Sequence, residues 1–196
     1  MIINLKLMHM KKTILITSFI LVIGVLLFTS CTKKFSQDAN GYVEIQKEIM
    51  AKFGNDAYFT NISVTYDKNV GDVIFVTVTD DPESMKMESW NYMKRKWEKV
   101  SDIVLELEEG NIRDFMYQLK DEYDLVRVGE LVELSLLKIQ EEEQIKDAVA
   151  KTVTLNAPDD TTSDETQIFI DIEPRSGGTS FTFFYDLDGA LIAFDY

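Results

Sequence analysis

The stretch from Met10 to Cys31 constrains the fold more than any other part of the sequence. Two lysines follow Met10, an almost unbroken apolar run occupies residues 14–28, and small residues close the stretch. A basic start, a short apolar run and a small-residue end are typical of a secretory leader. The run is also shorter than the roughly 20 apolar residues that a membrane-spanning helix needs. We therefore expect residues 1–30 to be a signal peptide, followed by an exported body.

The end of this leader, Leu27-Phe28-Thr29-Ser30-Cys31, resembles the lipobox of bacterial lipoprotein precursors. The resemblance implies that signal peptidase II cuts between Ser30 and Cys31, and that Cys31 then carries acyl chains. Phe28 stands where the family usually has Leu. The alternatives are an uncleaved signal anchor or a buried helix that ends in Cys. Met10 is the expected initiator, because the basic segment before the apolar run is then short.

Charge restricts the partners of the body. The whole chain has a formal net charge of −14, and removal of residues 1–30 takes away three lysines and no acids, which leaves −17. Such acidity opposes binding to nucleic acid and to anionic lipid headgroups. We therefore expect no nucleic-acid partner.

Cysteine and histidine are almost absent from the chain, which has one of each. Cys31 lies at the lipobox and His9 lies in the leader. The mature body would then have no histidine, no free thiol and no intramolecular disulfide. Catalytic triads, Cys–His pairs and the usual zinc ligands are thereby excluded. We expect a protein that is not an enzyme, with no metal and no cofactor besides the lipid on Cys31.

The first part of the body predicts one helix followed by four strands. Tyr42, Ile45, Ile49 and Phe53 recur at helical spacing, and Gly54 follows as a stop signal. Alternation by two then predicts strands at 58–66, 73–79, 85–93 and 97–107, with a helix as the alternative for residues 84–99. In the first strand, Tyr58 is expected to share a face with Ile62. Residues 111–124 are expected to form a short helix or loop that buries Phe115, Met116 and Leu119.

The second part repeats this order. Apolar spacing from Val128 to Val149 predicts the longest helix, which includes Ile145, Ala148 and Val149. Strands are expected at 152–155, 168–172, 181–185 and 190–196, with turns at 175–178 and 186–189.

This order of elements resembles the tandem α-β4 layout of β-lactamase-inhibitor-protein and PepSY-like secreted domains. The resemblance implies an α+β fold of two tandem units, each with a helix on one face of a four-stranded antiparallel sheet. It also implies a binding role more often than catalysis. The expected division is a tether at 31–40, a first unit at 41–124 and a second unit at 125–196.

One cluster combines aromatic and basic side chains in this acidic body and is the candidate partner-binding site. Its members are Trp90, Tyr92, Lys94, Arg95, Lys96 and Trp97. Such a patch suits contact with a protein or a glycan. The alternative is a hairpin whose aromatic residues pack on a helix and whose basic turn is solvated.

Carboxylates offer weaker candidates. Asp186-Leu187-Asp188-Gly189 resembles the start of a calcium loop, but the Glu that closes an EF-hand loop is missing. Residues 157–166 are expected to form a polar loop. Its four acids, Asp159, Asp160, Asp164 and Glu165, are candidates for weak cation binding, but a solvated loop is the favoured interpretation. Paired carboxylates are the chemistry of glycoside hydrolysis, but sequence spacing identifies no pair.

The sequence therefore favours a non-catalytic, lipid-anchored envelope protein that contacts a protein, peptide or envelope polymer through a sheet face. The alternatives are a carboxylate-based hydrolase of envelope glycans, or a carrier of a small ligand or calcium. Thr32 follows Cys31 where inner-membrane lipoproteins of enterobacteria have Asp, and two lysines come next. By this resemblance we expect the outer membrane, with the body facing the periplasm.

Overall fold

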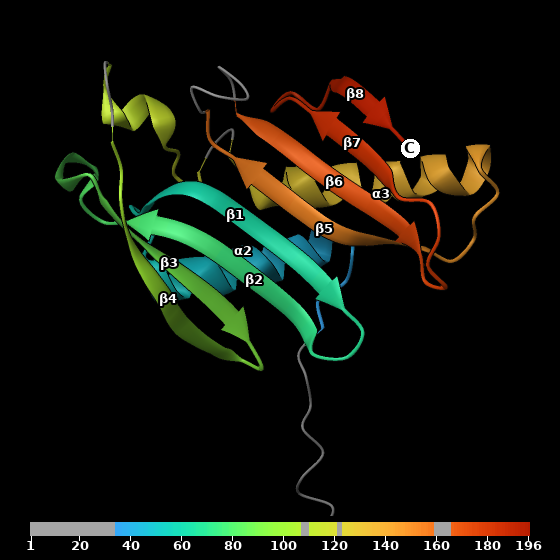
Figure 1. Cartoon of the computed structure of the whole chain (residues 1–196), viewed down its shortest axis with the longest axis horizontal. Helices are drawn as coiled ribbons and strands as arrows, with labels where there is room; N and C mark the ends of the chain where they lie inside the picture. Colours follow the sequence, from blue (N-terminus) through green and yellow to red (C-terminus); the bar gives the residue numbers. More distant parts are fainter. Residues whose placement is uncertain (1–33, 107–109, 121–122, 159–165) are drawn as a thin grey trace, which may run out of the picture. The chain divides into compact units, whose positions relative to one another are not determined.

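The computed structural model describes residues 34–106, 110–120, 123–158 and 166–196. Within these ranges the body is an α+β fold of two helices and eight strands (Figure 1). The first group of elements is α2 (Ala39–Phe53), β1 (Tyr58–Asp67), β2 (Gly71–Thr79), β3 (Lys86–Met93) and β4 (Lys96–Val104). The second group is α3 (Leu125–Glu142), β5 (Ala148–Asn156), β6 (Gln167–Pro174), β7 (Phe181–Tyr185) and β8 (Leu191–Asp195). Two short 3-10 turns, η1 (Pro82–Ser84) and η2 (Ile112–Phe115), lie in the connections.

Both helices begin at aspartate caps. The Asp38 carboxylate accepts a hydrogen bond of 2.8 Å from the Gly41 amide, and the Asp124 carboxylate accepts one of 2.9 Å from Val126. The first helix ends at Phe53, where the sequence predicts its end, because Gly54 adopts a positive φ of 87°.

The predicted end of the second helix is wrong. Helix α3 stops at Glu142, and Gln144 adopts a positive φ of 60°. Ala148 and Val149, whose spacing continued the helical pattern, instead begin β5 and pair with β6. The first apolar residues of β5 have the same spacing as those of α3, so periodicity alone did not indicate where the helix ends.

All eight strands form one antiparallel sheet, in the order β4-β3-β2-β1-β5-β6-β7-β8. Residues 86–93 are a strand, which settles the open choice between strand and helix. The four strands of each group do not form separate sheets, because β1 pairs with β5 at the centre, from Asn61 opposite Asn156 to Thr65 opposite Thr152. The expectation of two sheets is therefore corrected to one continuous sheet.

The two helices lie against the same face of this sheet (Figure 1). The buried residues of the strands point toward them, for example Val64, Ile74, Val153 and Ile170. A bulge in β1 between Phe59 and Asn61 shifts the alternation, so Phe59 joins this core in place of Tyr58. The opposite face of the sheet has no helix over it among the described residues.

The expected tether at 31–40 is also shorter than predicted. Within its described part, Phe35 is only 5% exposed and belongs to the core. The Gln37 side chain donates a hydrogen bond of 2.8 Å to the Ala150 carbonyl and accepts one of 2.9 Å from the Ala150 amide. The folded body therefore includes Phe35 and Gln37, which were expected to belong to the tether.

Candidate functional site

The sheet face without helices, called here the open face, has an uncharged centre. The strand register brings fourteen uncharged residues to it: Asn61, Ser63, Thr65, Phe75, Thr77, Ser89, Asn91, Thr152, Thr154, Asn156, Gln167, Phe169, Thr182 and Phe184. The same register also places six charged residues on this face, most of them at strand ends or on the outer strands: Asp67, Lys96, Glu98, Asp171, Glu173 and Asp195. Because 28% of the whole chain is charged, the centre of this face differs from the rest of the protein.

A ladder of polar pairs runs down the middle of the open face, where β1 meets β5. The Asn61 amide donates to the Asn156 side-chain oxygen at 2.6 Å. The hydroxyls of Ser63 and Thr154 lie 2.9 Å apart, and those of Thr65 and Thr152 lie 3.5 Å apart. Cross-strand hydroxyl pairs of this kind stabilise a sheet and hold side chains in fixed positions. The centre of the face is therefore ordered before any partner arrives.

Phenylalanines flank this ladder on both sides. Phe75, on β2, is 40% exposed and is paired in register with Ser63. On the other side, the rings of Phe169 and Phe184 contact each other edge to face, with centroids 5.4 Å apart. The register places all three in one row across the sheet with Ser63 and Thr154. This row combines aromatic surface with hydroxyl groups and has no charge at its centre.

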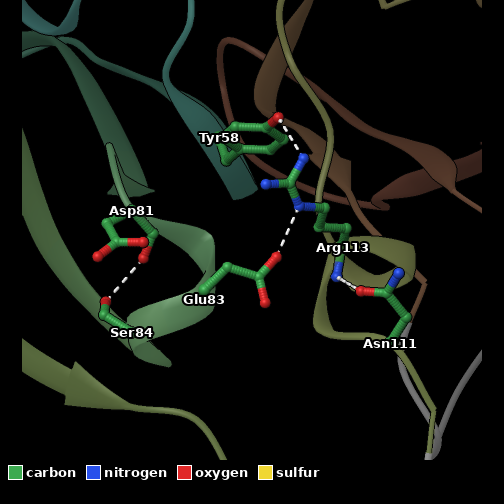
Figure 2. Close-up of polar contacts among 6 residues, drawn as sticks. All are labelled: Tyr58, Asp81, Glu83, Ser84, Asn111 and Arg113. Atoms are coloured by element: carbon green, nitrogen blue, oxygen red, sulfur yellow. Dashed lines mark hydrogen bonds and ion pairs between the residues drawn. The ribbon is translucent and has the colours of Figure 1, made fainter.

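One end of the open face is covered by a small second core. Met87 of β3 packs there with Ile112 and Met116 from the connection that follows β4. Figure 2 shows how Arg113 holds this cover in place: its guanidinium donates to Glu83 at 2.8 Å and to the Tyr58 hydroxyl at 3.3 Å. The same guanidinium lies 5.5 Å from the centre of the Tyr58 ring. The turns η1 and η2 thus form a border to the face.

The predicted aromatic and basic cluster divides between two places. Trp90, Tyr92 and Trp97 point toward the helix side, where Phe53 lies 5.8 Å from Trp90 and 4.9 Å from Trp97 between ring centroids. Tyr92 is 4% exposed and is part of the core. Lys52 lies over the Trp90 ring at 4.2 Å, a cation–π contact.

The basic members of that cluster lie at the β3–β4 turn. Lys94 and Arg95 have positive φ values of 52° and 67°, which suits a two-residue hairpin turn, and Lys96 begins β4 opposite Met93. All three are exposed. The cluster is therefore a hairpin with its aromatic residues on a helix and its charges at the tip.

A groove of about 690 Å³ opens where the chain enters the body. Its lining includes the cations Lys34, Lys68, Lys151 and Arg175, the acids Asp67, Asp72 and Glu173, and the apolar side chains Phe35, Leu136, Ala148 and Val149. Lys151 forms an ion pair with Glu173 at 3.0 Å.

The acid Asp72 in this groove has an unusual environment. Burial raises the pKa of its carboxyl, although the Phe35 amide donates to it at 2.5 Å and favours the charged form. The nearby hydroxyls of Tyr42 and Tyr66 are buried without a hydrogen bond of normal geometry to another described residue. Burial raises the pKa of both tyrosines. Tyr66 and Asp72 line the groove, and Tyr42 is buried next to them.

The carboxylates that resembled a calcium loop form a plain turn. The Asp186 side chain accepts a hydrogen bond of 2.7 Å from the Ala190 amide, and the Gly189 amide donates to the Asp186 carbonyl at 3.1 Å. Across the described ranges, no group of three or more His, Cys, Asp or Glu side chains lies close enough to hold a metal ion.

The remaining predicted positions lie outside what the structure describes. Ser30 and Cys31 precede residue 34, and the acidic loop 159–165 is also outside the described residues. Among the helices that are described, none combines the length and the apolar character needed to cross a bilayer.

No protein-family model matches this chain, and no curated protein or solved structure is significantly similar to it. A proposal about function therefore rests on the geometry of the body itself.

Proposed function

We propose that this protein is a lipid-anchored envelope protein whose open face binds a protein, a peptide or an envelope polymer without chemical change. The observation that carries the proposal is the uncharged row of Phe75, Ser63, Thr154 and Phe169 at the centre of a sheet face. Depletion of charge with enrichment of aromatic residues distinguishes the core of a binding interface from ordinary surface.

The roles within this face follow from chemistry. The exposed ring of Phe75 offers the kind of aromatic anchor that commonly dominates interface energies. The hydroxyl and amide ladder offers fixed donors and acceptors, which supply specificity. The small polar side chains at the centre of the face also lose little entropy on binding, because Ser, Thr and Asn have few rotatable bonds.

We also propose that the body consists of two tandem α-β4 units, one before and one after residue 125. The repeated order of a helix and four strands supports this division. So does the sheet order, in which each group occupies one half of the sheet and the first strands of the two groups meet at the centre. In this arrangement the open face spans both units, and its polar ladder lies at their junction.

The anchor belongs to the same proposal. Cys31 is the lone cysteine of the chain and closes the apolar leader. Acylation contributes about 0.8 kcal/mol for each CH₂ group that enters the bilayer, so two or three chains give stable attachment. Mass spectrometry of the membrane fraction should find a mature N-terminus at Cys31 with added acyl mass. A wild-type chain that keeps residues 10–30 in the membrane would reject this anchor.

The binding role is tested by site-specific photo-crosslinking in the cells that make the protein. A photoreactive amino acid at Phe75 is expected to give discrete crosslinked products. The matched control is the same amino acid at Leu134, which is exposed on α3. Products at both positions, or at neither, would contradict a specific partner on the open face. Substitution of Thr154 by Arg in the Phe75 crosslinking variant should abolish the products, because it places a charge at the centre of the row.

A further inference from the structure

The six hairpin connections of the sheet are segregated by charge. The connections at 68–70, 94–95 and 175–180, called here the basic end, contain Lys68, Lys94, Arg95 and Arg175 and no acidic residue. The connections at 80–85, 157–166 and 186–190, called here the acidic end, contain nine acidic residues by sequence and no basic one. The separation is complete for these six connections.

The strand register places the three basic connections at the same end of the sheet. Ala148 pairs with Pro174, so the start of β5 lies beside the end of β6. Thr152 of β5 pairs with Thr65 near the end of β1, so the start of β5 lies at the same end of the sheet as the end of β1. Ile74 pairs with Tyr92, which puts the end of β3 beside the start of β2. In Figure 1 the β1–β2 and β3–β4 turns both lie toward the lower edge of the view.

The chain also enters the body at the basic end. Lys34 lines the groove together with Lys68, Lys151 and Arg175, and the adjoining Gln37 is bound to Ala150 at the start of β5. Lys34 and the four cations of the basic connections form no ion pair with another described residue. Lys151 in the same groove pairs with Glu173, and Lys99, Arg113, Arg127 and Lys138 elsewhere in the body each form an ion pair. All five of the unpaired side chains, Lys34 included, are exposed.

Chain length limits how far this end can lie from the proposed anchor. Cys31 precedes Lys34 by three residues, and three fully extended residues span at most about 11 Å. The acidic end is separated from the basic end by the length of the strands, about 33 Å for a ten-residue strand such as β1. At physiological ionic strength the Debye length is about 8 Å. A surface that touches the basic end is therefore screened from the acidic end, whatever the net charge of the chain.

From this geometry we infer that the basic end binds the anionic phospholipid headgroups of the membrane that holds the anchor. The strands then stand away from the bilayer, the acidic end points outward, and the open face is presented sideways to partners. This inference rests on the proposed anchor at Cys31. Five cations make the contact: Lys34, Lys68, Lys94, Arg95 and Arg175. Three of them, Lys34, Lys68 and Arg175, also line the groove, where Asp67, Asp72 and Glu173 lie as well.

The test uses the full acylated protein, purified from membranes and reconstituted into vesicles. Vesicles of phosphatidylcholine alone are compared with vesicles that also contain phosphatidylglycerol. An amine-reactive reagent labels exposed lysines, and mass spectrometry measures the labelling rate at each one. Contact between one basic side chain and an anionic surface contributes about 1 kcal/mol, a factor of about five at 25 °C. We expect Lys34, Lys68 and Lys94 to be labelled about fivefold more slowly on the anionic vesicles, and salt near 1 M to remove the difference by shortening the Debye length to about 3 Å.

Internal and matched controls separate this contact from general effects. Lys86 and Lys120 are exposed and lie outside the basic end, so their labelling rates should be equal on both vesicles. The triple variant Lys68→Gln, Arg95→Gln, Arg175→Gln should lose the protection of Lys34 and Lys94. The triple variant Lys47→Gln, Lys86→Gln, Lys120→Gln removes the same charge elsewhere and should keep it.

The two proposals fail in distinguishable ways. Protein that floats with the vesicles but shows equal labelling of Lys34, Lys68 and Lys94 on both kinds would overturn the headgroup contact and leave the anchor intact. Protein that does not float and lacks acyl mass at Cys31 would overturn the anchor and the contact together.

Discussion

Phe35 shows how one residue extends the folded body into a segment whose composition is that of a linker. Its neighbours from Thr32 to Asn40 are mostly polar, but its ring is buried and lies 6.3 Å from the ring of Tyr92. The same residue donates its amide to Asp72. Phe35 thus closes the end of the core beside the groove.

Replacing Phe35 by Ala should lower the free energy of unfolding by about 3 kcal/mol, the usual cost of deleting a buried aromatic ring. Chemical denaturation of the purified protein measures this change. Lys34→Ala, at the neighbouring exposed position, is the control and should leave the free energy of unfolding nearly unchanged. Equal stability of the two variants would mean that Phe35 is only loosely attached.

Asp72 predicts a pH dependence of stability. Burial raises the pKa of this carboxyl in the folded protein above the value of about 3.9 in an unfolded chain. Its contribution to stability is therefore fully present below pH 3.9 and is lost as pH rises through the folded pKa. Asn at this position does not titrate and can still accept the Phe35 amide.

The melting temperature of Asp72→Asn, relative to the wild type, should consequently increase as the pH is raised from about 4 toward 7. Thermal unfolding followed by circular dichroism across this range tests the sign. Asp56→Asn, at an exposed carboxyl, controls for the loss of one negative charge. A relative melting temperature that falls with rising pH would show that the Phe35 hydrogen bond outweighs burial.

At the scale of elements, local periodicity predicted the strands and the first helix well, because most of these have one buried face. The exceptions are the two edge strands, β4 and β8, which contain no buried residue. The wrong predictions lie where the residues that follow a helix continue its spacing, or where a bulge shifts the inward and outward alternation of a strand. Ile145, Ala148 and Val149 continued a helical spacing although α3 ends at Glu142. The bulge between Phe59 and Asn61 exchanged the inward and outward residues at the start of β1, whereas Ile62 and Val64 point inward as predicted, and no residue type in that segment signals a bulge.

The contact between the two helices depends on Gly129. A Cβ atom at this position would lie 2.7 Å from Ala39 Cα and 2.8 Å from the Asp38 carbonyl oxygen, both of which are backbone atoms. The first turn of α2 therefore packs directly against the backbone of α3. Leu125 adds a second link, because its amide donates to the Gln46 side chain at 2.8 Å.

Gly129→Ala separates packing from helix propensity, because the two effects have opposite signs. In a helix without this contact, Ala is favoured over Gly by about 1 kcal/mol. Here the clash should dominate and destabilise the protein by about 1–3 kcal/mol, the usual range for overpacking. Denaturant unfolding measures the difference, with Glu133→Ala on the exposed side of α3 as the control. An increase in stability would show that the helices can move apart at little cost.

For the whole molecule, the order of helices and strands can be predicted from the sequence, but the pairing of all eight strands into one sheet cannot. The pairing of β1 with β5 joins residues about ninety positions apart, and no local pattern determines it. The same holds for the candidate site. The alternating polar residues Ser63, Thr65, Thr152 and Thr154 are visible in sequence, yet only the β1–β5 register brings them into one ladder. The groove and the basic end likewise arise from segments that are distant in the chain.

The single sheet predicts that neither half of the body folds alone. A fragment of residues 34–124 would expose β1 as a long edge strand, and a fragment of residues 125–196 would expose β5 in the same way. Unpaired edges of this length favour aggregation. Each fragment would also lose the contact between the two helices at Gly129.

Expressed separately, the two fragments should therefore be insoluble or lack a cooperative unfolding transition. Expressed together, they should associate through the β1–β5 pair and recover the two-state unfolding of the intact body. Substitution of Val64 by Pro tests the route of assembly, because Pro removes a backbone donor from the centre of β1 and should prevent association. The matched control is Val104→Pro, at the exposed end of the outer strand β4, which should allow association. If each fragment alone gave a cooperative unfolding transition, the two α-β4 units would be independent domains. The pairing of β1 with β5 would then fix only how the two units are oriented relative to each other.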